Sequence, residues 1–385
     1  MSRNGASKGI HDKDGGGCPG WGMEKGVRGL TPYHIVGEQL MVESWPEQGI
    51  AAKPATGGTT LTSMSYRTRL EAAFKGLPVD RPPVSFWRHF PGRDHTVDLL
   101  VAATVEFQRR FDLDLVKLMP TGMYPVIDYG VEVEPSTDDL GTTRYVTGPV
   151  KVPADLARLP EVSPARGVLA EQAAVVAGVR AALGPETPII QTVFSPLAMM
   201  AKLVGGTIGA AFLDDAKALG RTLDRLADDA IAFGQACLER GADGFFFATQ
   251  LANAAFPLDL YERFGVSYDL KVLEALRRDS WGIVLHLHGA DPYFALADRY
   301  PVDAVSWEDR ETSPSLADAL ARTTRCLVGG VGRNHPLVSS GAEEVATQVR
   351  EAIARTEGRR LIVAPGCVVP MSAPERNLVA LRAAV

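Results

Sequence analysis

The stretch Trp281-Gly-Ile-Val-Leu-His-Leu-His-Gly289 decides how the rest of the chain is interpreted. Its centre is an unbroken apolar run, which is typical of a strand buried on both faces of a parallel sheet. The run ends in His286 and His288 and stops at a glycine. Residues two apart on a strand point to the same side, so both imidazoles can face a single ion.

Short apolar runs of this kind recur along the chain and alternate with longer segments of helical periodicity. The predicted strands are Pro83–Trp87, Asp114–Met119, Ile189–Phe194, Gly244–Ala248, Ile283–Leu287, Ala304–Trp307, Cys326–Val331 and Leu361–Ala364. The clearest helical segments are Tyr66–Phe74, Leu169–Leu183, Ala216–Arg240, Tyr268–Arg278, Ser315–Arg325 and Ala342–Thr356. Eight buried strands with helices between them predict a single α/β domain over residues 63–385, a (β/α)8 TIM barrel.

Three features lie outside this repeat. Val131–Glu134 and Thr143–Val146 predict a small β-hairpin inserted after the second strand. Ser372-Ala-Pro-Glu375 predicts a capping box at the start of the last helix. Residues 1–62 are Gly-rich and aperiodic, so we expect a disordered tail or a non-native extension upstream of Met64.

Composition excludes several functional classes. The net charge is −6 and no dense run of Lys and Arg is present, which argues against nucleic-acid binding. No stretch approaches 18 apolar residues, so no membrane span is expected, and the start lacks the apolar region of a secretory signal. The four cysteines have no framework spacing, which favours a reduced, cytoplasmic protein.

A third potential metal ligand follows another apolar run near the C-terminus. Cys367 comes directly after Leu361-Ile-Val-Ala-Pro-Gly366, at the end of the eighth predicted strand. With His286 and His288 it predicts a zinc site with two nitrogens and one sulfur, and with the fourth position open. Glu308 is a candidate fourth ligand, a partner that fixes a histidine tautomer, or a base. The alternative is two packed histidines beside a buried thiol.

Other polar residues are predicted at the same end of the barrel, where such folds carry their active sites. The candidates for substrate binding are Arg88, Arg93, Gln250 and Arg333, and those for catalysis are Glu308, Lys202 and His89. Paired arginines suit the capture of carboxylates. The alternatives are a surface loop in which Arg93 pairs with Asp94, and a Lys202 exposed to solvent.

From about Met64 to Val385 the chain resembles the uroporphyrinogen decarboxylase superfamily. The matching segments are Asp80-Arg-Pro-Pro-Val84, Trp87–Arg93, Ser195-Pro with Val204-Gly-Gly206, Gly241–Gln250, Val302-Asp-Ala-Val305 and Pro365-Gly-Cys-Val-Val-Pro370. The resemblance implies a (β/α)8 barrel, often a homodimer, with its site in the barrel mouth.

The superfamily contains two chemistries, and the residues match them unequally. Cofactor-free decarboxylases hold carboxylates with arginines, which Arg88 and Arg93 resemble. Their aspartate falls near Met119, their tyrosine at Lys202 and their late histidine at Cys367, so the decarboxylation residues are not matched.

The second branch comprises zinc-dependent methyltransferases that pass a methyl group from a corrinoid protein to a thiol. Their ligands follow a His-x-Cys…Cys pattern, which His286 and Cys367 match and in which His288 replaces the first cysteine. A site with one thiolate is less negative than a site with two, so we expect it to act more as a Lewis acid than by charge donation.

Three functional hypotheses follow. The first is a zinc-dependent methyltransferase-like enzyme that activates a thiol or small oxygenated substrate, with a corrinoid protein as candidate partner. The second is metal-free decarboxylation of uroporphyrinogen in porphyrin biosynthesis. The third is a non-catalytic accessory protein that binds a corrinoid or tetrapyrrole.

Overall fold

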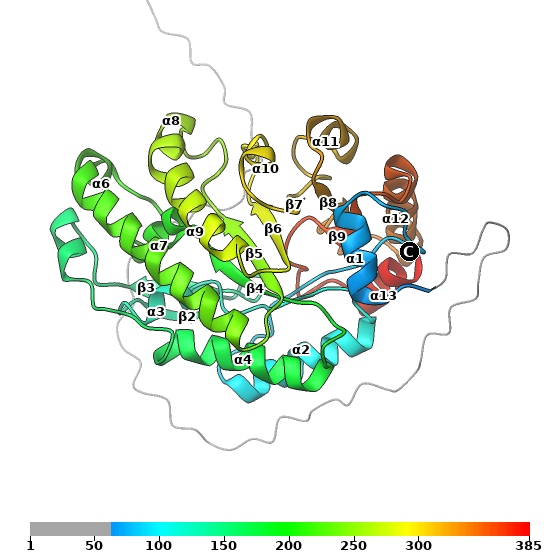
Figure 1. The fold of residues 1–385 in the computed structure, drawn as a ribbon, viewed down its shortest axis with the longest axis horizontal. Coiled ribbons are helices and arrows are strands. Elements are labelled where there is room, and N and C mark those ends of the chain that lie inside the picture. The colour runs from blue at the N-terminus through cyan, green and yellow to red at the C-terminus, as the bar shows by residue number, and fades with distance from the viewer. Residues whose placement is uncertain (1–62) are drawn as a thin grey trace, which may run out of the picture. The chain divides into compact units, whose positions relative to one another are not determined.

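The computed structural model describes residues 63–385, so the expectations for residues 1–62 lie outside the described residues. Seven parallel strands form one curled sheet with helices around it (Figure 1). In their order across the sheet they are β1 (Val116–Lys117), β4 (Ile189–Phe194), β5 (Gly244–Thr249), β6 (Gly282–Leu287), β7 (Ala304–Ser306), β8 (Cys326–Val331) and β9 (Leu361–Pro365). Every residue of these strands is buried, which explains why their sequences are apolar without alternation.

The first predicted strand completes the barrel, but only as a short bridge. Val84 pairs with Val363 of β9, and the Asp114 N–H just before β1 donates to the Val84 carbonyl at 2.9 Å. The segment therefore fills the eighth position between β9 and β1. Pro82 and Pro83 have no N–H to donate, which explains why a longer ladder does not form here. The (β/α)8 barrel is confirmed with one strand reduced.

The predicted helices are confirmed as α1 (Tyr66–Phe74), α4 (Gly167–Leu183), α7 (Ala216–Glu239), α9 (Ser267–Arg277), α11 (Leu316–Arg322) and α12 (Ala342–Thr356). The predicted last helix is α13 (Glu375–Ala383). The structure also contains α2 (Val97–Phe111), α3 (Tyr124–Ile127), α5 (Pro196–Leu203), α6 (Ala210–Asp214), α8 (Leu258–Tyr261), α10 (Leu296–Arg299), the 3₁₀ turn η1 (Pro153–Arg158) and the π-turn η2 (Glu262–Val266). No helix of the described chain is long and apolar enough to cross a membrane.

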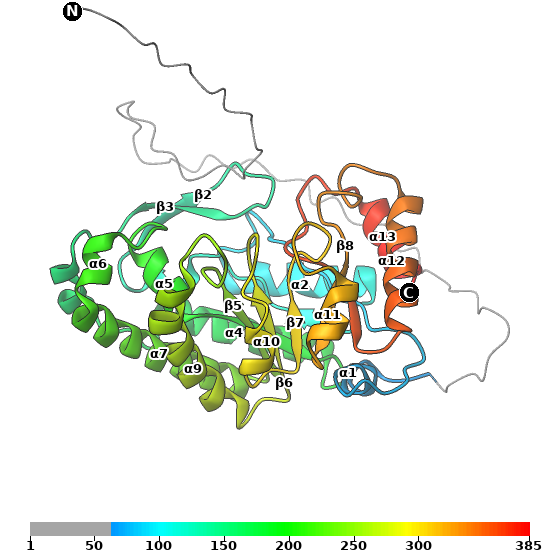
Figure 2. The same ribbon diagram turned by 90° about the horizontal axis from the view of Figure 1, so that it is seen from above.

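The predicted hairpin is also confirmed. Strands β2 (Glu132–Pro135) and β3 (Thr143–Thr147) pair antiparallel, and Figure 2 shows them on the side of the molecule away from α1. The loop between them contacts the segment that follows β9: the Met371 N–H donates to the Asp139 carbonyl at 2.6 Å, and the Ser372 N–H donates to its carboxylate. The capping box at Ser372 is therefore wrong, because this serine hydrogen-bonds Asp139 and α13 begins only at Glu375.

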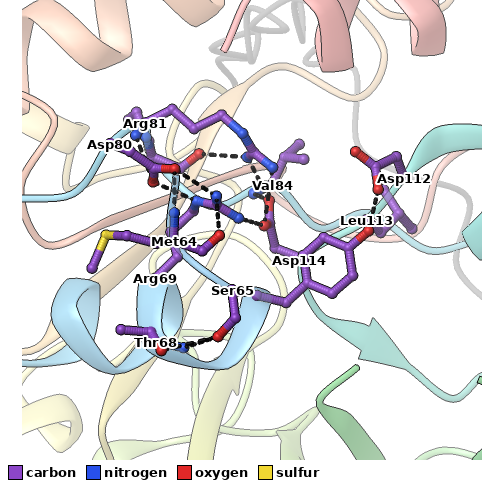
Figure 3. A network of polar contacts seen from close by, with 12 residues as sticks. Met64, Ser65, Thr68, Arg69, Asp80, Arg81, Val84, Asp112, Leu113 and Asp114 are labelled. Atoms are coloured by element: carbon purple, nitrogen blue, oxygen red, sulfur yellow. Dashed lines mark hydrogen bonds and ion pairs between the residues drawn. The ribbon is translucent and has the colours of Figure 1, made fainter. Parts of the chain in front are cut away.

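A network of buried ion pairs joins α1 to the segment that closes the barrel (Figure 3). Arg69 of α1 contacts Asp114 at 2.5 Å and Asp80 at 2.7 Å, and Arg81 contacts the other oxygen of Asp114 at 2.6 Å. The same Asp114 carboxylate accepts the backbone N–H of Val84 at 2.9 Å. Each buried charge therefore has a partner of opposite sign, the condition under which burying it is tolerable. We call Arg69, Asp80, Arg81 and Asp114 the basal network.

Candidate metal centre at the barrel mouth

His286, His288 and Cys367 converge at the carboxyl ends of β6 and β9. Cys367 Sγ lies 3.6 Å from His286 Nε2 and 3.7 Å from His288 Nδ1, and the three potential ligand atoms all lie within 4.8 Å of one another. Bond lengths of about 2.0 Å to nitrogen and 2.3 Å to sulfur place such ligands about 3.6 Å apart around a tetrahedral zinc ion. The two nitrogen–sulfur spacings fit that geometry.

Neighbouring strand ends fix these three side chains. The Thr249 hydroxyl donates to the His286 carbonyl at 2.9 Å, and the Asn253 amide donates to the His288 carbonyl at 2.8 Å. Cys367 depends on Gly366, where an added Cβ would lie only 2.4 Å from the Cα of Glu308. A glycine is therefore needed for the loop after β9 to pass so close to the loop after β7.

The protonation states of the three residues suit metal ligation, since ligands must be deprotonated to bind. Burial lowers the pKa of His286 and of His288, which keeps both imidazoles neutral. Burial alone would raise the pKa of Cys367, but the hydrogen bond with His286 and the positive charge of Arg333 act in the opposite direction, and the pKa is lowered. The cluster therefore favours two neutral imidazoles, and the lowered pKa of Cys367 makes its thiol easier to deprotonate when a metal binds.

A hydrogen bond orients His286. Its Nδ1 lies 3.2 Å from the hydroxyl of the buried Ser306 on β7, while its Nε2 faces Cys367. Donation from Nδ1–H to this hydroxyl leaves the Nε2 lone pair free to coordinate, which is the usual arrangement of a metal-binding histidine. Phe246 of β5 stacks on the same imidazole, with 5.0 Å between the ring centroids.

Glu308 and Arg333 form an ion pair beside the cluster. Their charged atoms are 3.3 Å apart, and the side chains are only 12% and 11% exposed. The negative charge of Glu308 opposes the burial that lowers the pKa of His288, and the positive charge of Arg333 acts in the opposite direction. The structure thus brings both residues to the predicted site, paired with each other.

Three basic residues at the mouth lie in buried positions. Lys202 of α5 is only 9% exposed, with its Nζ 4.4 Å from the centroid of the Phe194 ring, so the alternative of an exposed lysine is wrong. Lys117 of β1 is equally buried and was not predicted; its Nζ lies 4.5 Å from the Phe246 centroid. Burial lowers the pKa of each lysine to about 7. Burial, with the charges of both lysines, lowers the pKa of His89 to about 4.

The remaining predicted residues differ in their burial and in their partners. Arg88 is half-buried, and its guanidinium donates to Met371 Sδ at 2.9 Å. Gln250 directly follows β5. Arg93 pairs with Glu106 of α2 at 2.7 Å, and both side chains are exposed. The structure therefore does not bring Arg93 to the cluster, and its partner is Glu106 rather than the Asp94 of the alternative.

The comparisons with known proteins agree with this fold. The family model of uroporphyrinogen decarboxylase (URO-D) matches residues 65–385. The chain belongs to the uroporphyrinogen decarboxylase family. This family is part of an enzyme superfamily, and the match covers the whole barrel together with the hairpin insertion.

Similar members of the family include methyltransferases. The chain is 23% identical over 354 residues to the methylcobamide:CoM methyltransferase MtaA of Methanosarcina barkeri, covering 84% of this chain and 98% of that protein. It is also 23% identical to the methylcobamide:CoM methyltransferase MtbA of Methanosarcina acetivorans, where it spans 57% of that protein's length. A solved methyltransferase from Methanosarcina mazei has the same fold, with a TM-score of 0.73 and 23% identity over 84% of this chain and 98% of the other.

Proposed function

We propose that this protein is a zinc-dependent methyltransferase-like enzyme that transfers a methyl group to a small thiol or oxygenated acceptor. The observation that carries the proposal is the convergence of His286, His288 and Cys367 within 4.8 Å at the barrel mouth. Two nitrogens and one sulfur suit zinc, and three protein ligands leave a fourth position for a substrate. The similarity to methylcobamide:CoM methyltransferases supports the same class of reaction.

Zinc held by these residues would lower the pKa of a bound thiol, so that the nucleophilic thiolate exists near neutral pH. The protein's own residues prepare the site for that chemistry. Ser306 fixes the tautomer of His286, and the neutral state of both imidazoles keeps their lone pairs available. The single thiolate of Cys367 leaves the site less negative than a site with two thiolates, which favours Lewis-acid behaviour.

The acceptor then attacks the methyl carbon of the donor. If the donor were a methylcobamide, a thiol held beside His286, His288 and Cys367 would lose its proton to solvent and its sulfur would take the methyl group. A carbon–sulfur bond would form, and the electron pair of the broken cobalt–carbon bond would stay with the corrinoid. We propose that a separate corrinoid protein delivers this group, because the similar proteins are methylcobamide:CoM methyltransferases. A homodimer and a cytoplasmic location remain part of the proposal.

Metal analysis of the purified full chain tests the proposal. We expect about one zinc per chain in the wild type and in His95→Ala, which removes an exposed histidine away from the cluster. His288→Ala and Cys367→Ser should lose most of that zinc and the transfer of methyl from methylcobalamin to 2-mercaptoethanol. A wild type that takes up no zinc would overturn the proposal.

The decarboxylase alternative has its own readout. Metal-free protein that converts uroporphyrinogen to coproporphyrinogen would favour that reaction. The residues oppose it, because Met119 stands where the decarboxylases carry an acid and contacts Lys117 instead. Tight binding of a corrinoid without turnover would favour the accessory-protein alternative.

A further inference from the structure

The β2–β3 hairpin reaches across the ends of several barrel strands, on the side of the molecule away from α1 (Figure 2). It is inserted after β1, yet the Tyr145 ring lies against Gly205, which follows α5, where an added Cβ would be 3.1 Å from that ring. Its turn lies against the loop after the first barrel segment, since an added Cβ on Gly141 would be 2.6 Å from Pro91. The same turn contacts the segment after β9 through Asp139. The hairpin therefore spans the ends of β9, the closing bridge, β1 and β4.

Asp139 holds the turn of the hairpin against the segment after β9. Its carbonyl accepts the Met371 N–H at 2.6 Å, and its carboxylate accepts the Ser372 N–H at 2.8 Å together with the Ser372 hydroxyl. Met371 lies four residues after Cys367 in the same loop (371 − 367). A short stretch of chain therefore connects the contact made by Asp139 to a candidate metal ligand.

The neighbouring aspartate, Asp138, shapes the turn from within. Its carboxylate accepts the N–H of Leu140 at 3.0 Å and the N–H of Thr142 at 3.3 Å, and it accepts the Ser136 hydroxyl at 2.8 Å. An aspartate that bonds the backbone two residues further on forms an Asx turn. Because Asp138 supplies the hydrogen bonds inside the turn, Asp139 is available to bond a group outside the hairpin.

The hairpin is otherwise attached to the barrel by few contacts. β2 has no buried residue, and in β3 only Thr143 is buried. The two strands pair with each other and contact the other helices and strands of residues 63–385 only sparsely. A two-stranded hairpin is at best marginally stable by itself. Asp139, Met371 and Ser372 are all exposed, so water competes for their hydrogen bonds. These contacts can therefore break and reform while the barrel stays folded.

We propose that the β2–β3 hairpin is a flap over the barrel mouth, and that Asp139 is the latch that closes it on the loop carrying Cys367. In the closed state, which the structure shows, Cys367 is only 5% exposed. Release of the latch frees the turn of the hairpin and opens the mouth to reactants. The inference deepens the proposed function and rests on it, since the flap controls access to the same cluster. The latch itself uses only contacts within the chain, so it can be tested without metal.

The rate at which iodoacetamide alkylates Cys367 measures opening of the flap. The full chain is stripped of metal by chelation, and the modified cysteines are identified by peptide mass spectrometry. We expect Asp139→Ala to react about tenfold faster than the wild type, because the opening equilibrium no longer opposes the hydrogen bonds to Ser372. The rate reports access rather than acidity, since the charges that act on the pKa of Cys367 come from residues outside the hairpin. Asp215→Ala is the matched control, because Asp215 is also exposed and accepts one backbone N–H, and it should react like the wild type.

Two other cysteines distinguish opening of the flap from general loosening of the fold. Cys237 in α7 and Cys326 in β8 are fully buried, and burial raises the pKa of both thiols. We expect both to stay unmodified in every variant. Asp139→Asn keeps an oxygen that can accept the Ser372 N–H, so its Cys367 should react at a rate between those of the wild type and Asp139→Ala.

An Asp139→Ala variant that reacts at the wild-type rate would overturn the proposal. Faster modification of Cys237 and Cys326 together with Cys367 would overturn it as well, because the whole barrel would then be loosened. These outcomes are independent of the zinc measurement. A protein that takes up no zinc but shows the expected alkylation would refute the proposed function and keep the flap, whereas a zinc-binding protein with unchanged alkylation would do the reverse.

Discussion

The base and the mouth of the barrel bury positive charge in opposite ways. At the base, Arg69 is 4% exposed and contacts two carboxylates, Asp80 and the fully buried Asp114. At the mouth, Lys117 and Lys202 are about as buried but have aromatic neighbours and no carboxylate within the described residues. A buried charge with an opposite partner stabilises the fold, whereas a buried charge without such a partner costs free energy that other interactions must offset. The contrast separates residues that stabilise the barrel from residues that we propose serve its site.

The largest expected effect on stability is at the base. Asp114→Asn removes a carboxylate that pairs with Arg69 and Arg81 and accepts the Val84 N–H. Breaking a buried pair leaves an uncompensated charge, so we expect the free energy of unfolding to fall by about 3–5 kcal/mol. Urea denaturation measures this loss. Glu343→Gln, which breaks an exposed pair with Arg350, is the control and should cost less than about 1 kcal/mol. Equal losses in the two variants would contradict the special role of the base.

Acid should weaken the same network. Burial alone would raise the pKa of Asp80, but the hydrogen bonds from Arg69 and from the Met64 N–H outweigh it and lower that pKa to about 2. A folded-state pKa below the unfolded value gives stability above about pH 4 that is lost as the pH falls toward 2. The loss is on the order of 2 kcal/mol. Urea midpoints measured from pH 5 to pH 2 test this. In Asp80→Asn this part of the pH dependence of stability should be missing. If the urea midpoint of that variant fell with pH as steeply as in the wild type, the loss could not be assigned to Asp80.

Local patterns in the sequence predicted most of the fold, because the strands are buried on both faces. Ile189–Phe194 and Cys326–Val331 are strands with the predicted bounds. The first strand was predicted too long, because the prediction rested on its apolar character alone. Pro82 and Pro83 have no N–H to donate to a ladder, and this limits the pairing.

The candidate site was predictable where residues lie at strand ends. Placing His286 and Cys367 required only the strand assignment, and the structure brings them to 3.6 Å. Lys117 was missed, because one lysine inside a short strand gives no sign of the direction it faces. Arg93 was assigned to the site although its partner, Glu106, lies 13 residues away on a helix that patterning did not single out.

Replacing a buried lysine at the mouth should raise stability, whereas replacing the buried Asp114 at the base should lower it. Lys202→Met replaces an uncompensated buried charge by an apolar chain of similar length. We expect the free energy of unfolding to rise by about 1–2 kcal/mol, as when other buried charges are replaced by apolar residues. Lys271→Met on the surface, where Asp228 is the partner at 2.8 Å, should change stability by less than about 1 kcal/mol. If Lys202→Met lowered the free energy of unfolding by several kcal/mol, this lysine would be a structural residue. That result would contradict the proposed difference between the base and the mouth.

Two fully buried serines allow the finest comparison, since Ser85 follows the closing bridge at Val84 and Ser306 ends β7 at the mouth. Ser85 donates to the Leu115 carbonyl at 2.9 Å, whereas Ser306 contacts His286 Nδ1 at 3.2 Å. Ser85→Ala should lower the free energy of unfolding by about 1 kcal/mol and leave zinc affinity unchanged. Ser306→Ala should weaken zinc binding by about 10–100-fold, because His286 loses the partner that fixes its tautomer, with a smaller change in stability. Competition with a chromophoric chelator measures the affinity. If both alanine variants lowered zinc affinity alike, the serine beside His286 would be acting through general packing rather than through its hydrogen bond.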